Sequence, residues 1–87
     1  MKEAIKNKLI KLIDTTDEEA IKYIDMFLDE PFIKRDLDFV SHTVYCYKDR
    51  IKEFIKSYEF IDDRQKVSVV LTYIHCCIVA IIFDIKR

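Results

Sequence analysis

The chain has 87 residues, enough for a single small domain over residues 1–87, and its charges almost cancel, with 15 Lys and Arg against 16 Asp and Glu. Apolar residues make up 51% of the chain and charged residues 36%, a balance typical of a globular domain and not of a disordered segment. The lack of glycine excludes the glycine-rich loops that hold nucleotides and the glycine turns that carry catalytic serines. Tight β-hairpins also rely on glycine at their turns, so a chain without glycine is unlikely to form a sheet. We therefore expect an all-α fold.

Residues 2–13 are predicted to form an amphipathic helix. From Ile5 onward, apolar residues recur at i, i+4, i+7 and i+8, which is one face of a helix with a 3.6-residue period. The remaining positions include four lysines, Lys2, Lys6, Lys8 and Lys11. These lysines are the basis of one alternative function, a small nucleic-acid-binding or transcription-regulating module, because lysines neutralise phosphate groups.

A second short helix is predicted to follow directly. Thr16 and Glu19 match the capping-box pattern, which predicts that this helix begins near Asp17. Pro31 should end the helix, because proline has no backbone N–H and disfavours a helical residue before it.

Acidic residues concentrate on this second helix and its flanks. Residues 14–38 hold nine acids against three cations, although the whole chain is nearly neutral. We interpret this excess as an electronegative surface that docks on a partner protein with a basic surface. The candidate partner-binding residues are Asp17, Glu18, Glu19, Asp25, Asp29 and Glu30.

The most regular apolar pattern runs from Ile33 to Tyr58, with apolar residues spaced alternately by four and three. This heptad pattern predicts one long helix over residues 32–59, which would be roughly 42 Å long if unbroken. The weakest stretch is residues 34–38, where Asp36 could cap a restart of the helix.

Residues 67–85 repeat the same spacing and are apolar on nearly all sides, which predicts a central helix. Its β-branched residues would also suit a strand, but a stretch of this length without a turn signal favours a helix. A membrane span is an alternative, because the length fits a bilayer core. Polar residues such as His75 and Asp84 argue against it, because they are costly within a membrane.

The predicted fold is therefore an all-α, antiparallel bundle of four helices, two short and two long. Because 87 residues give a small core, we expect a homodimer that forms through one of the long helices. The predicted dimer or core seam consists of Leu37, Val40, Val44, Tyr47, Ile51, Phe54, Leu71, Ile74, Ile78 and Ile81.

Two residue patterns point to chemistry. His42 and Cys46 lie four apart, a spacing that metal ligands use, and His75 is a further candidate, but without a CxxC or HxxxH pair we expect neither metal nor cofactor. Arg35 and His42, with Asp36 after the arginine, resemble the Arg-x(4–6)-His element of HEPN ribonucleases. That resemblance implies that Arg35 and His42 face each other across a dimer and cleave RNA.

The absence of a catalytic constellation and of a basic face, together with the acidic second helix, favours a non-enzymatic protein-binding regulator or inhibitor. By its size and genome bias it would be of the antitoxin, immunity or anti-defence type. Gly, Ala, Pro and Arg total 8 residues whereas Ile and Lys total 25, a bias typical of an AT-rich genome such as that of a phage or virus. Three cysteines without an apolar leader segment indicate the cytoplasm, which is the host's if the chain is viral. The alternatives are the nucleic-acid module, a HEPN-like ribonuclease and a small membrane-associated protein.

Overall fold

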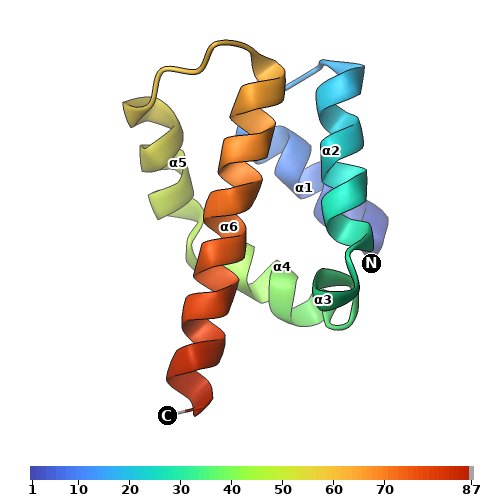
Figure 1. The fold of residues 1–87 in the computed structure, drawn as a ribbon, viewed down its shortest axis with the longest axis vertical. Helices are drawn as coiled ribbons and strands as arrows, with labels where there is room; N and C mark the ends of the chain where they lie inside the picture. Colours follow the sequence, from blue (N-terminus) through green and yellow to red (C-terminus); the bar gives the residue numbers. More distant parts are fainter. Residues whose placement is uncertain (87) are drawn as a thin grey trace.

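Six helices make up the fold within residues 1–86, which the computed structural model describes, with side chains through residue 84. In chain order they are α1 (Lys2–Ile13), α2 (Glu18–Asp29), α3 (Pro31–Lys34), α4 (Leu37–Cys46), α5 (Lys48–Ser57) and α6 (Asp63–Lys86) (Figure 1). No strand occurs in this part of the chain, so the all-α prediction is confirmed. The predicted count of four helices is wrong, because the long helix expected over residues 32–59 is divided into three.

Aspartates set the boundary between the first two helices. α1 ends at Asp14, whose left-handed backbone, with φ of 60°, closes the last turn. Aspartate tolerates this conformation because its short polar side chain bonds locally. α2 begins where the sequence predicts, but the capping residue is Asp17 and not Thr16. The Asp17 carboxylate accepts hydrogen bonds from the backbone N–H groups of Glu19 and Ala20.

Two turns divide the segment predicted as one helix. Pro31 ends α2 as expected and occupies the first position of α3, where its fixed φ suits a helix start. Asp36 then leaves the helical conformation and its carboxylate accepts from the backbone N–H of Phe39, so it caps α4 as expected. The second turn, at Tyr47, has no counterpart in the sequence prediction. Nearby, the Thr43 hydroxyl donates to the carbonyl of Phe39, a bond that bends helices.

α6 is the axis of the fold, and the helical prediction for residues 67–85 is confirmed. In Figure 1, α6 runs the length of the molecule, with α2 along one side, α5 along the other and α4 crossing its lower half. All six helices contribute to the core, whose buried residues are Ile5, Leu9, Ile13, Ala20, Ile24, Phe27, Leu28, Ile33, Val40, Val44, Ile51, Val67, Val70, Leu71, Ile74 and Ile78.

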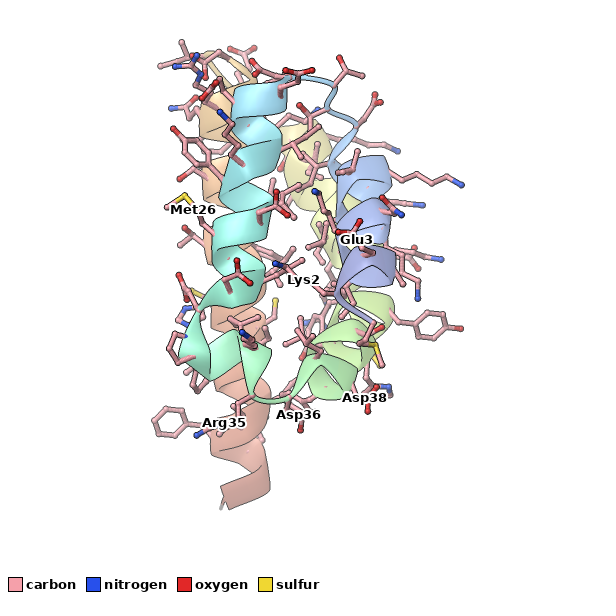
Figure 2. All side chains as sticks on the ribbon, turned by 90° about the vertical axis from the view of Figure 1, so that its right-hand side faces the viewer. Lys2, Glu3, Met26, Arg35, Asp36 and Asp38 are labelled. Atoms are coloured by element: carbon pink, nitrogen blue, oxygen red, sulfur yellow. The ribbon has the colours of Figure 1, made fainter. Side chains whose placement is uncertain are left out.

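The two ends of α6 differ in how they are held. At its start, the hydroxyl of buried Thr15 donates to an Asp63 carboxylate oxygen at 2.7 Å. The Lys66 ammonium also donates to the Asp14 carbonyl at 3.5 Å, so the link between α1 and α2 is joined to α6. The last turns of α6 extend past α3 and α4 in both views (Figures 1 and 2).

The bundle is flat, with extents of 38 × 26 × 16 Å. Because packed helices lie about 8–10 Å apart, the thinnest direction holds only two layers of helices. α6 is therefore covered from one side, and its opposite side faces solvent. This uncovered side positions the surface described below.

Candidate docking surface

The acidic side of α2 is partly neutralised by α1, which pairs with two of its four acids. The Lys2 ammonium lies 2.7 Å from an Asp29 carboxylate oxygen, and the Lys6 ammonium lies 3.1 Å from one of Asp25. Figure 2 shows Lys2 in the space between the two helices. Two of the six predicted partner-binding residues therefore join α2 to α1 within one chain.

The Lys2–Asp29 pair shifts the pKa of both groups. The hydrogen bond from Lys2, with a smaller contribution from its charge, lowers the pKa of the Asp29 carboxyl below its ordinary value of 3.8. The same hydrogen bond raises the pKa of Lys2 above 10.5. Both side chains are exposed, so solvent screens the pair, and it aligns α1 with α2 more than it stabilises the fold.

The other four predicted partner-binding acids have varied surroundings. Asp17 caps α2, and Glu19 pairs with Lys22 at 3.1 Å on the same helix. Glu18 and Glu30 are exposed, and neither forms an ion pair within the part of the chain that the structure describes. The predicted acidic surface is thus much weaker than the sequence charge indicates.

A strip of exposed side chains along α2 and α6, here called the α2–α6 face, is the larger surface feature. Its members are Tyr23, Met26, Ser68, Thr72, Cys76, Ala80 and Phe83. The α6 members fall within about 120° of the helix circumference, so they share one side of it. Met26 is 65% exposed and Phe83 is 67% exposed, and Figure 2 shows Met26 pointing outward from α2.

A shallow groove of about 310 Å³ lies in this face where α2 meets α6. Tyr23 and Met26 line one wall, and Thr72 and His75 line the other. The Thr72 hydroxyl donates to the Ser68 carbonyl at 2.9 Å, which satisfies that hydroxyl within α6. The face is largely apolar, although Tyr23, Ser68 and Glu30 also bring polar groups to the groove.

The residues of the predicted dimer or core seam pack within one chain. Six of them are buried, namely Val40, Val44, Ile51, Leu71, Ile74 and Ile78. Four are half-buried, namely Leu37, Tyr47, Phe54 and Ile81. The buried six lie in the core of the single chain, so they are not available as a surface between two chains.

The candidate metal ligands do not form one site. The Cys46 sulfur lies 3.4 Å from Nε2 of His42, and both side chains are exposed. His75 packs instead against Phe32, with ring centroids 5.6 Å apart and an edge-on arrangement. Among the described residues, no group of three or more His, Cys, Asp and Glu side chains is arranged to hold a metal ion.

Arg35 and His42 of the HEPN-like element also contact different residues within one chain. The Arg35 guanidinium lies 5.5 Å from the centre of the Phe32 ring. Arg35 lines a groove of about 190 Å³ next to Phe39 and α6, and His42 is not among its lining residues. In one chain, His42 contacts Cys46 instead.

α6 also has the length and composition of a membrane span over Asp63–Asp84. Only 28% of that apolar window is buried inside the molecule, because the bundle covers α6 from one side. The core helix of a soluble protein passes the same test of length and composition. The uncovered part of the window overlaps the α2–α6 face.

The α2–α6 face was missed by the sequence reasoning. Its signal is the recurrence of Ser68, Thr72, Cys76 and Ala80 every four residues, which a search for large apolar residues does not register. A four-residue repeat of small side chains indicates a side of a helix that a second helix can approach closely.

The chain matches no protein-family model, no curated protein and no solved structure.

Proposed function

We propose that the chain is a non-enzymatic protein-binding regulator or inhibitor that works as a homodimer, with the α2–α6 face as its seam. The observation that carries this proposal is the exposed, largely apolar strip along α6. In a two-fold dimer the same patch serves both partners, so a continuous strip along one helix is well suited to self-association. Dimer formation would remove water from the apolar side chains of the α2–α6 face on both copies.

The side chains of the strip have the sizes that close helix packing requires. Small residues spaced by four leave a groove into which the ridge of a second helix fits, at a crossing angle of about −50°. Met26 and Phe83 are the most exposed large apolar members of this face, and methionine and aromatic side chains are enriched in protein interfaces. They would supply most of the buried area, while Ala80 and Ser68 set the distance between helices.

The start of α2 supports the second part of the proposal, binding to a partner with a basic surface. Glu18 and Glu19 are both exposed in the first turn, and the ion pair of Glu19 with Lys22 lies on the same helix. Neither residue takes part in the ion pairs that join α2 to α1. Both therefore stay available to a partner after the chain has folded.

Sedimentation equilibrium over a range of micromolar concentrations tests the dimer. We expect a dimer for the native chain and a monomer for Ala80→Lys and Met26→Lys, because each places a charge in the seam. The matched control is Ile61→Lys, which adds the same charge at a residue that is 85% exposed and lies outside the α2–α6 face. Circular dichroism of each variant reports whether the helices are intact.

Three outcomes would overturn the seam. The first is a native chain that stays monomeric at all concentrations, and the second is a dimer that both seam variants leave intact. The third is partition of the native chain into the detergent phase or into neutral lipid vesicles, which would assign the exposed side of α6 to a membrane.

Affinity purification from the native host tests partner binding. Glu18→Lys with Glu19→Lys should reduce recovery of the partner found with the native chain, because charge reversal opposes a basic surface. Glu53→Lys with Glu59→Lys, two exposed acids outside α2, changes the net charge by the same amount and is the control. Equal recovery with all three proteins would refute the acidic docking site and leave the dimer result untouched.

A further inference from the structure

A third groove lies on another side of the molecule, between α1, α4 and α5, with a volume of about 600 Å³. Its lining residues are Ile5, Lys8, Lys11, Leu12, Ser41, Val44, Tyr45, Lys48 and Lys52. The volume falls within the range of about 300–1,000 Å³ that is typical of small-molecule sites. None of these residues belongs to the α2–α6 face, so the groove is independent of the proposed dimer.

The rim of this groove carries uncompensated positive charge. Four lysines surround it, namely Lys8, Lys11, Lys48 and Lys52. Across the side chains that the structure describes, none of the four forms an ion pair, whereas Lys2 and Lys6 on the other side of α1 both do. No acidic side chain lines the groove. The basic side of the chain is therefore concentrated here.

The lysines of each helix lie close enough to repel each other, and a bound anion would reduce that repulsion. Lys48 and Lys52 lie four apart on α5, and Lys8 and Lys11 lie three apart on α1. Like charges at these helical spacings oppose each other because the side chains are neighbours on the helix surface. An anion bound between α1 and α5 would interact favourably with both pairs.

The floor of the groove is aliphatic. Ile5 and Val44 are buried beneath it, and Leu12 is half-buried at its side. Tyr45, which is 73% exposed, forms an aromatic edge. Such a floor favours a hydrocarbon chain. It offers little to a nucleotide base, whose polar edges would lose hydrogen bonds against aliphatic side chains.

We propose that this groove binds a small anionic amphiphile of the fatty-acid type, with its carboxylate among the lysines and its hydrocarbon tail on the Ile5, Leu12 and Val44 floor. The head group would accept hydrogen bonds from lysine ammonium groups, and charge-assisted bonds of this kind are among the stronger ones. The tail would cover the exposed parts of Leu12 and Tyr45 and the aliphatic stems of the lysines, because Ile5 and Val44 are already buried.

Isothermal titration calorimetry with sodium decanoate, kept below its critical micelle concentration, tests the site. Decanoate should bind with one-to-one stoichiometry per chain. Hexanoate should bind more weakly because its tail is shorter, and decyltrimethylammonium should not bind because its charge is reversed. Adenosine monophosphate is the probe for the nucleotide alternative. Amide chemical shifts should move at Leu12, Val44 and Tyr45 when decanoate is added.

Two variants separate the head-group site from the tail site. Lys8→Gln with Lys48→Gln removes two rim charges and should weaken decanoate binding by about tenfold or more, because each charge-assisted bond is worth more than a neutral one. Tyr45→Ala should weaken decanoate more than hexanoate. The matched control is Lys56→Gln, an exposed lysine of α5 outside the groove, which should bind decanoate like the native chain.

Four results would overturn the proposal. They are the absence of saturable decanoate binding, equal binding of the decyl cation, tighter binding of adenosine monophosphate, and equal loss of binding in Lys56→Gln. Because the groove lies apart from the α2–α6 face, Ala80→Lys should bind decanoate normally. A failure of the dimer proposal is therefore distinguishable from a failure of this one.

Discussion

The two halves of α6 resemble each other in sequence but have different surroundings. In the first half, Val67, Val70 and Ile74 are fully buried against the other helices. In the second half, full burial ends at Ile78, Ala80 and Phe83 are exposed, and the last turns extend beyond α3 and α4 (Figure 1). The apolar spacing of four and three runs through both halves without a break.

This contrast shows what apolar spacing does and does not determine. The spacing reports that a helix has an apolar side, but not what covers that side. A core, a second copy of the chain and a bilayer all satisfy the same pattern. Only the layout of the other helices decides among them, and here the two-layer bundle covers the first half of α6 more fully.

The largest expected change in stability comes from a substitution in the first half of α6, which the other helices bury. Ile74→Ala should lower the free energy of unfolding by about 2–5 kcal/mol, because it removes a fully buried side chain and leaves a cavity. Phe83→Ala, in the other half, should change it by less than about 0.5 kcal/mol when measured in the monomer. Urea unfolding monitored by circular dichroism gives both values. Equal losses of unfolding free energy in the two variants would mean that both halves of α6 are equally buried.

A smaller loss of stability is expected when the Thr15–Asp63 hydrogen bond at the start of α6 is removed. Thr15→Val should cost about 1–3 kcal/mol, because it removes a buried hydroxyl from Asp63 and leaves that carboxylate without its partner. Thr16→Val is the matched control, since Thr16 is adjacent and exposed. A control that loses as much stability as Thr15→Val would show that the loss comes from placing valine in this link and not from removing the Thr15–Asp63 hydrogen bond.

The helix type and most boundaries were accessible from the sequence because they rest on local chemistry. Pro31 and Asp36 act through their own backbone and side chains, so their effects were foreseen. The turn at Tyr47 was not, because the pieces on both sides of it pack on the same core and keep the apolar spacing in phase. The ion pairs of Asp25 and Asp29 with α1 were also not predicted, since they require knowing that α1 lies beside α2.

Two adjacent cysteines test the difference between the buried and the exposed side of α6. Burial, with a smaller contribution from the neighbouring Cys76, raises the pKa of the Cys77 thiol above its ordinary value of 9.0. The thiolate is the reactive form, so Cys77 should react with iodoacetamide at least about tenfold more slowly than exposed Cys76. Mass spectrometry of timed digests measures both rates. Equal rates would show that α6 opens as readily at Cys77 as at its surface.

The smallest expected effect is the pH dependence of the Lys2–Asp29 pair, which helps α1 hold α2 against α6. The lowered pKa of Asp29 makes its contribution complete above 3.8 and lost as the pH falls through the lowered value. The raised pKa of Lys2 makes its contribution complete below 10.5 and lost as the pH rises through the raised value. Lys2→Met should therefore flatten the acidic side of the stability profile slightly, as measured by thermal unfolding between pH 2 and pH 7.

The position of α6 as the last of the six helices in chain order has a consequence for how the chain acquires its structure. The apolar sides of α1 and α2 meet α6 across a long stretch of sequence, as the Thr15–Asp63 bond illustrates. During synthesis α1 and α2 emerge first and can pack on each other, but the main packing partner of α2 forms only when α6 leaves the ribosome. Until then the nascent chain would expose the apolar surface that α6 later covers, and it would be prone to aggregation.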